Sequence, residues 1–314
     1  MKKIAIAGAG AMGGRIGTQI QEAGYDVTLL DYWQAHVEKI KREGIEIQTE
    51  TDTYHLDIKA QFPEEVNEQF DLIIILTKAM KSREMIKVLN ERGAIGEDTA
   101  ILTMMNGLGH DETFAEVVPK SQIFLAVTMW TAGMRGPGQL LLEGDGTIDL
   151  QRADGLDDER TRAINQIFND AKLNSRISDD VFQSVWSKAT LNSVLNPLCT
   201  ILDKRIGEFA KYEQAREMIT PIINEIIAVA EARGVKLDFD ALVAKVEGSY
   251  PDELQGLHYP SMHQDLHSGR YTEIDYLNGK ITQYGKELGI STPTNELLTH
   301  MIHQLEMQYV TQES

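Results

Sequence analysis

The fold of this chain is decided by the stretch KIAIAGAGAMGGRIGTQIQEAGYDVTLLD, residues 3–31. The apolar run 3–7 predicts a buried strand, residues 14–22 a helix, and residues 26–30 a second strand. A G-x-G-x-x-G motif joins the first strand to the helix, and Asp31 follows the second strand, 18 residues after Gly13. This order of strand, glycines, helix, strand and acid is typical of a dinucleotide-binding unit.

Each glycine of this motif has a physical task. Gly8 allows a tight turn, Gly10 lets the backbone approach a pyrophosphate, and Gly13 lets the helix pack closely on the strand. The unpaired N–H groups at the helix start suit a phosphate. A glycine-rich turn in another kind of α/β domain is the alternative. The predicted cofactor-binding residues of the turn are Gly8, Ala9, Gly10, Ala11, Met12 and Gly13.

Asp31 distinguishes between the two nicotinamide cofactors. A carboxylate at this strand end accepts hydrogen bonds from the ribose 2′-hydroxyl of NAD and repels the 2′-phosphate of NADP. We therefore expect NAD(H) to be preferred over NADP(H). Capping of the following turn is the alternative role for this aspartate.

Length and charge limit the remaining possibilities. The chain has 314 residues, which favours two domains, and its formal net charge is −18. That charge argues against a general binder of nucleic acids or anionic membranes, because both require positive surface. No apolar run reaches the roughly 18 residues of a membrane helix. The first residues loosely resemble a secretory signal, but their glycines favour a turn.

The two halves of the chain differ in pattern. Buried strands are predicted at 71–77 and 100–105, and Lys78 and Asn106 follow them, where ligands bind in parallel sheets. Either residue is alternatively an ordinary loop residue. From residue 179 onward long helices dominate, at 181–202, 213–233, 273–288 and 294–307, and Pro197 and Pro221 should kink or bound theirs. We predict an α/β Rossmann-type N-terminal domain, 1–178, and an all-α C-terminal domain, 179–314.

One helix of the second half has a polar stripe. Lys188, Asn192 and Asn196 are spaced i, i+4, i+8, so they share one helix face among apolar neighbours. A cation with two amides on a mostly buried helix is suited to bind an anion and a carbonyl. A solvated stripe on a surface helix is the alternative.

Histidines near residue 260 raise the question of a metal. His258, His263 and His267 lie near Asp265, but Gln264 stands where a H-E-x-x-H motif requires glutamate, so we expect no metal. The single cysteine, Cys199, excludes an intrachain disulfide and fits a reducing, cytoplasmic location.

Several of these segments together resemble the ketopantoate reductase (2-dehydropantoate 2-reductase) family, which includes D-2-hydroxyacid dehydrogenases of the D-mandelate type. The resemblance spans the chain. Its markers are Gly8-Ala9-Gly10-Ala11-Met12-Gly13, Thr77-Lys78-Ala79, Asn106-Gly107, Trp186-Ser187-Lys188, Asn192, Asn196-Pro197, Ser261-Met262, Gln264-Asp265, Thr272-Glu273-Ile274-Asp275-Tyr276 and Asn278-Gly279.

The resemblance implies roles for the polar residues. Lys188 matches the family's general acid, and Glu273 matches the carboxylate that orders the lysine and the substrate. The positions that match substrate-binding residues are Asn192, Asn196 and Ser261. Lys78 and Asn106 match residues near the cofactor and the interdomain cleft.

Two departures shift the expected substrate. Many family members have a basic residue where Asp31 stands, and His258 stands where an asparagine is usual. We therefore predict NAD-dependent reduction of bulky or branched 2-oxo acids to (R)- or D-2-hydroxy acids, as in D-mandelate dehydrogenase. Two alternatives remain: reduction of ketopantoate to pantoate, and a non-catalytic NAD-binding sensor. We expect a small 2-oxo or 2-hydroxy acid as partner, no nucleic acid and no membrane; a homodimer is left open.

Overall fold

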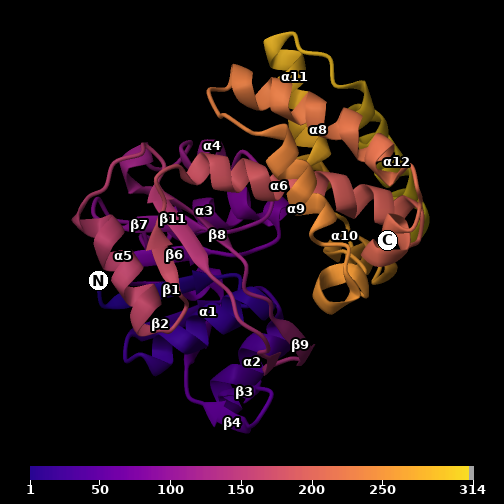
Figure 1. Ribbon diagram of the computed structural model, residues 1–314. Helices are drawn as coiled ribbons and strands as arrows, with labels where there is room; N and C mark the ends of the chain where they lie inside the picture. Colours follow the sequence, from indigo (N-terminus) through magenta and orange to yellow (C-terminus); the bar gives the residue numbers. More distant parts are fainter. Residues whose placement is uncertain (311–314) are drawn as a thin grey trace. The chain divides into compact units, whose positions relative to one another are not determined.

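A computed structural model describes residues 1–310 of the chain. The chain divides into two compact units (Figure 1). The first comprises residues 1–105 and 110–181, and the second comprises residues 106–109 and the chain from 182. No helix among the described residues is long and apolar enough to cross a membrane.

The first unit is built on an eight-stranded sheet in the order β12-β11-β8-β7-β6-β1-β2-β5. All neighbouring strands are parallel except β11 and β8. The strands are β1 Lys3–Ala7, β2 Asp26–Leu30, β5 Lys59–Gln61, β6 Leu72–Ile75, β7 Ala100–Thr103, β8 Ile123–Thr128, β11 Ile148–Arg152 and β12 Ser175–Ile177. The chain starts in the middle of the sheet and winds outward in both directions, which confirms the predicted Rossmann-type fold.

The strand core explains why these segments pair. In β6 all four residues are buried, and in β1 only Lys3 is exposed. Such continuous apolar runs are typical of parallel strands covered on both faces. The connecting helices are α1 Ala11–Glu22, α2 Gln34–Glu43, η1 Pro63–Glu65, η2 Ala79–Lys81, α3 Ser82–Glu91, α4 His110–Phe114, η3 Lys120–Gln122 and α5 Glu159–Asp170.

A second, four-stranded sheet has the order β4-β3-β10-β9. Its strands are β3 Ile45–Gln48, β4 Thr53–Leu56, β9 Gly133–Gly136 and β10 Gln139–Leu141. The glycines and the proline of residues 133–138 favour a turn, but β9 pairs antiparallel with β10 as a hairpin. Glycines at both ends of β9 concealed this strand, because glycine has low strand propensity.

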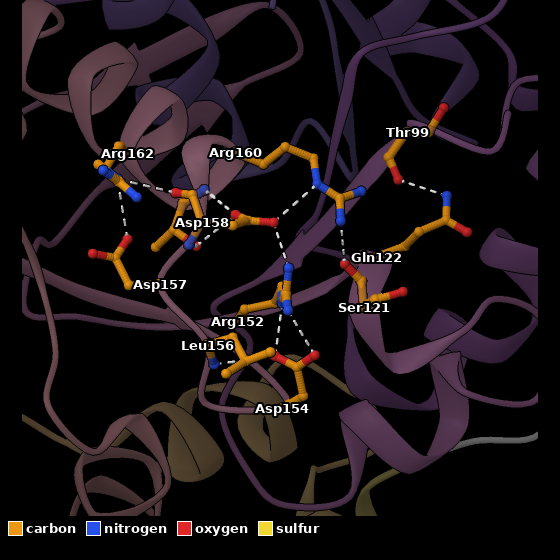
Figure 2. Close-up of polar contacts among 11 residues, drawn as sticks. Thr99, Ser121, Gln122, Arg152, Asp154, Leu156, Asp157, Asp158, Arg160 and Arg162 are labelled. Carbon is orange, nitrogen blue, oxygen red and sulfur yellow. Dashed lines mark hydrogen bonds and ion pairs between the residues drawn. The ribbon is translucent and has the colours of Figure 1, made fainter.

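An ionic network fixes α5 to the neighbouring strand β11 (Figure 2). The Asp158 carboxylate caps α5 by accepting a hydrogen bond from the Thr161 amide at 2.9 Å. The Arg152 guanidinium, only 8% exposed, pairs with both Asp154 and Asp158. Arg160 donates to the Ser121 carbonyl oxygen at 2.9 Å. The buried arginine thereby has its charge compensated, as an interior cation requires.

The second unit consists of helices around a core of its own. They are α6 Val181–Ile201, α7 Ile206–Ala210, α8 Ala215–Ala232, α9 Phe239–Glu247, η4 Asp252–Gly256, α10 Ser261–His267, η5 Ile274–Tyr276, α11 Asn278–Leu288 and α12 Pro293–Tyr309. Continuous helix was predicted at 273–288, but η5 and α11 are separate. Leu277 interrupts them with a φ of −111° and a ψ of −106°.

Neither predicted proline breakpoint ends its helix, because α6 continues past Pro197 and α8 past Pro221. Proline has no N–H, so in α6 the carbonyl of Ser193 lacks its usual helical donor. The side-chain amide of Asn278 donates to that oxygen at 2.9 Å. A residue remote in sequence therefore compensates for the missing hydrogen bond.

Candidate functional site

The glycine turn of the first unit is shaped by backbone contacts. Gly8 has a φ of +98°, and a Cβ there would lie 2.5 Å from the Thr77 amide nitrogen. A Cβ on Gly13 would lie 1.9 Å from the Gly8 carbonyl oxygen and 3.2 Å from Ile6 in β1. A side chain at Gly8 would push the turn away from the backbone that follows β6, and one at Gly13 would force the start of α1 away from β1, so both glycines are sterically required.

Gly10 differs from its neighbours in the turn. A Cβ there would meet nothing within 4 Å. Gly10 is also the N-cap of α1, and without a side chain it leaves the first-turn N–H groups uncapped. A helix start that is open to solvent and presents N–H groups fits a phosphate. The geometry of residues 8–13 is therefore suited to hold a pyrophosphate.

Asp31 links the end of β2 to this turn. One carboxylate oxygen accepts a hydrogen bond from the Ala9 amide at 2.7 Å, and the other accepts one from the Trp33 amide at 2.9 Å. The second bond is the turn-capping role considered above. Each carboxylate oxygen can accept more than one hydrogen bond, so both roles are compatible.

The side chain of His36 is hydrogen-bonded to the same turn. Its Nδ1 accepts a hydrogen bond from the Gly138 amide at 2.8 Å, so Nε2 bears the hydrogen and donates to the Ala9 carbonyl oxygen at 3.0 Å. Burial lowers the pKa of His36, despite the nearby Asp31 charge. The neutral ring is thus a structural support for the turn.

Lys78 and Asn106, the two other site residues predicted in the N-terminal half, belong to different units. Lys78 is exposed and lies three residues after the end of β6. Asn106 follows β7 but belongs with the helical unit. There the Leu108 amide donates to the Tyr276 carbonyl oxygen at 2.9 Å, and Gly107, with a φ of +99°, fits against Tyr276. The Asn106–Gly107 turn is therefore held close to the segment that contains Glu273.

In the helical unit, α6 carries the predicted polar stripe. Lys188, Asn192 and Asn196 all lie within this continuous helix, and the Asn196 side chain is buried. Their apolar neighbours Val194 and Leu195 are almost completely buried. The stripe thus lies on a core helix, which argues against the alternative of a solvated surface stripe.

The charge of Lys188 is controlled by three effects. Burial lowers its pKa, the positive charge of Lys245 lowers it further, and the negative charge of Glu273 raises it, for a result of about 8. An ammonium group with this pKa is largely protonated at neutral pH and can release its proton readily. Lys188 is therefore a candidate proton donor.

Lys245 was not predicted from the sequence. It lies on α9, and its ammonium group donates a hydrogen bond to the Ser187 hydroxyl at 2.9 Å, one residue before Lys188. No local motif marks it, because its effect depends on the packing of α9 against α6. Lys245 is recognised as part of the site only because the tertiary structure brings it near Lys188.

The segment that contains Glu273 is anchored from α12. The buried Glu306 carboxylate accepts hydrogen bonds from both the amide and the hydroxyl of Thr272, at 2.8 and 2.7 Å. The other Glu306 oxygen is hydrogen-bonded to His303 Nδ1, and His303 Nε2 lies 2.9 Å from a carboxylate oxygen of Asp275. The backbone on both sides of Glu273 is therefore fixed. Ser261, the last predicted residue, is exposed and begins α10.

Comparison with known proteins identifies both parts of the chain. Residues 4–155 match the model of the ketopantoate reductase PanE/ApbA family, and residues 180–306 match that of its C-terminal part. A 2-dehydropantoate 2-reductase of Lactococcus lactis is 39% identical over 97% of this chain and 98% of its own length. One from Streptococcus pyogenes serotype M3 is 38% identical over 96% of this chain and 97% of its own.

The structure also has solved relatives. A D-mandelate dehydrogenase bound to NADH and anilino(oxo)acetate is 39% identical, with a TM-score of 0.92 over 98% of this chain and all of its own. A ketopantoate reductase of the PanE/ApbA family from Ralstonia eutropha is 26% identical, with a TM-score of 0.89 over 98% of this chain and 100% of its own. The chain belongs to the ketopantoate reductase family of oxidoreductases, which act on the CH–OH group of 2-hydroxy acids with a nicotinamide cofactor.

Proposed function

We propose that this protein catalyses the NAD-dependent reduction of bulky or branched 2-oxo acids to D-2-hydroxy acids, with Lys188 as the general acid. The observation that supports the role of Lys188 most directly is its place on the core helix α6, where burial and the Lys245 charge lower its pKa to about 8. A lysine at its ordinary pKa would hold its proton too tightly for efficient transfer at neutral pH.

The reaction requires charge compensation at one oxygen. When bound, the nicotinamide would supply the hydride that the carbonyl carbon of the substrate accepts. Negative charge then grows on the carbonyl oxygen, and the Lys188 ammonium stabilises it and donates the proton. Glu273 keeps Lys188 charged between turnovers, since its carboxylate raises the lysine pKa.

The amides of α6 are assigned to the substrate. Asn192 and Asn196 follow Lys188 on the same helix face, one and two turns further on. Their N–H groups, together with the Ser261 hydroxyl, orient the substrate carboxylate through hydrogen bonds. Asn106, fixed beside Tyr276, is proposed as a further polar contact of substrate or cofactor.

The first unit supplies the cofactor site. Gly8–Gly13 and the start of α1 would hold the pyrophosphate, Asp31 the ribose hydroxyls, and Lys78 would lie along the cofactor at the end of β6. The carboxylate of Asp31 is already oriented by two amides, so a 2′-phosphate there would face a fixed negative charge.

Two substrate classes are each favoured by an observation. The similarity to D-mandelate dehydrogenase with an aromatic oxo acid bound favours bulky 2-oxo acids. The similarity to the Lactococcus lactis reductase favours ketopantoate as the second candidate. The oxidoreductase family leaves a non-catalytic sensor without support.

The deciding experiment is a substrate panel with NADH. We expect the highest kcat/KM with phenylglyoxylate or 2-oxoisocaproate and a lower value with ketopantoate. If ketopantoate exceeds both by tenfold or more, the second candidate is correct. Binding of NADH without turnover of any of the three acids would contradict both.

A parallel experiment addresses the cofactor. We expect kcat/KM for NADH to exceed that for NADPH by at least tenfold, because like charges in contact are costly. Asp31→Asn keeps a hydrogen-bond acceptor but removes the charge, so it should reduce this ratio. An NADPH preference in the native protein would refute the role of Asp31. A cytoplasmic location and a homodimer remain predictions, the latter decided by analytical ultracentrifugation.

A further inference from the structure

Three side chains of the helical unit, outside the proposed catalytic groups, converge from two distant segments. Asp203 follows α6, and His263 and His267 lie one turn apart on α10. One potential ligand atom from each lies within 4.8 Å of the other two. The sequence had suggested Asp265 as the acidic partner of these histidines. In the structure Asp265 instead pairs with Arg270 at 3.0 Å.

The histidines are oriented before any ligand binds. His267 Nδ1 lies 3.0 Å from the His263 carbonyl oxygen, and a carbonyl can only accept, so Nδ1 bears the hydrogen. The lone pair of His267 is therefore on Nε2. In metal-binding histidines, a hydrogen bond donated by the other ring nitrogen in this way fixes the tautomer. The His263 ring stacks between Tyr259 and His267, with centroids 4.0 and 3.9 Å away.

Asp203 is the third member of the cluster, and its backbone adopts an unfavourable conformation. Its backbone is left-handed, with a φ of +50°, a conformation that aspartate tolerates better than most residues. Its carboxylate is 2.8 Å from His263 Nε2. An aspartate carboxylate is charged at neutral pH, so it can serve as an anionic ligand. The side chain is 72% exposed and can be reached from solvent.

We propose that Asp203, His263 and His267 form a binding site for a divalent first-row transition metal such as Zn²⁺. Two imidazoles and one carboxylate are ligands that zinc and its neighbours accept, whereas Mg²⁺ and Ca²⁺ prefer oxygen ligands. Three protein ligands leave a coordination position for water. Ligand atoms bonded to one zinc ion lie roughly 3.4 Å apart, so the cluster contracts and the stacked rings splay on binding.

The test uses untagged full-length protein titrated with Zn²⁺ by calorimetry, and with Co²⁺ by visible absorption. We expect one metal per chain with a micromolar Kd, and a Tm that rises with Zn²⁺. Asp203→Asn, which suits the left-handed backbone, and His267→Gln should each weaken binding at least tenfold. His55→Gln, which removes an exposed histidine of the first unit, should bind as the native protein does.

The outcomes separate clearly. Loss of affinity in both cluster variants, with unchanged affinity in His55→Gln, supports the site. Binding that is equally tight in all variants, or no saturable binding by the native protein, overturns it. The unliganded Tm of each variant establishes that it is folded, so weak binding cannot be attributed to unfolding.

Discussion

The glycine turn of the first unit and the Lys188 environment of the second are built in opposite ways. The turn, residues 8–13, is continuous in sequence, and its properties come from backbone atoms and from the absence of a side chain at its three glycines. The Lys188 environment combines side chains from α6, α9 and the segment before η5. A backbone site tolerates almost no change in shape, whereas a side-chain site depends on the balance of charges.

The largest effect is expected where the charge itself is removed. Lys188→Ala should lower kcat about a thousandfold, because it removes both the proton donor and the stabilising cation. Lys236→Ala, at an exposed lysine of the same unit, is the matched control and should leave kcat unchanged. Steady-state kinetics with NADH measures both. A kcat within tenfold of the native value would remove Lys188 from the mechanism.

The glycine turn gives a contrasting pair of variants. Gly13→Ala places a Cβ 1.9 Å from a backbone oxygen, so it should destabilise the first unit by about 3 kcal/mol. Gly10→Ala meets no atom within 4 Å, so stability should change by less than about 0.5 kcal/mol. Thermal unfolding measures both.

The same pair separates stability from cofactor binding. Gly10→Ala should weaken NADH binding at least tenfold in a fluorescence titration, because the new methyl group stands where the pyrophosphate approaches. Native affinity for NADH in a folded Gly10→Ala protein would show that the turn has no part in binding.

This contrast also explains how much the sequence could predict. The strand, turn and helix of residues 3–31 depend on local periodicity and glycine placement, so their prediction was confirmed. Strand β9 was missed because its glycines favour a turn in isolation and only pairing with β10 makes it a strand. The continuation of α6 past Pro197 could not be predicted either, because the donor that replaces the missing N–H group is the side chain of Asn278, remote in sequence.

The residues of the candidate site also divide into those that local sequence predicts and those that depend on tertiary contacts. The spacing of Lys188, Asn192 and Asn196 could be read from one helix, whose continuity the structure confirms. The role of Lys245 could not be predicted, because Lys245 lies 58 residues after Ser187 in the sequence and reaches it from another helix. Charge effects between side chains depend on tertiary distance, which a single sequence does not contain.

Lys245 therefore provides a finer test of the side-chain site. The general acid must be protonated, so kcat/KM for reduction should fall as the pH rises above about 8, the pKa of Lys188. Lys245→Met removes a nearby positive charge and should raise that pKa, moving the alkaline limb upward by about one pH unit. Lys245→Arg retains the charge and should leave the limb in place. An unmoved limb in Lys245→Met would mean that the two lysines are not coupled.

The smallest expected effect is on the pH dependence of stability, for which we compare two histidines, one from each unit. Burial lowers the pKa of His36 beneath the glycine turn. Burial alone would also lower the pKa of His303, but its hydrogen bond to Glu306 and the Asp275 charge raise it instead. The His36 contribution to stability is therefore present above about pH 6.5 and lost as the pH falls to the lowered pKa.

The sign for His303 is opposite. Its contribution is fully present below about pH 6.5 and is lost as the pH rises through the raised pKa. His303→Gln should thus cost a few tenths of a kcal/mol at pH 5.5 and less at pH 8.5, a small value because the side chain is 40% exposed. Thermal unfolding of the variant and the native protein at both pH values measures the difference. A stability gap of equal size at both pH values would show that the pairs with Glu306 and Asp275 do not retain the proton on His303, and that this anchor of the Glu273 segment acts through packing rather than charge.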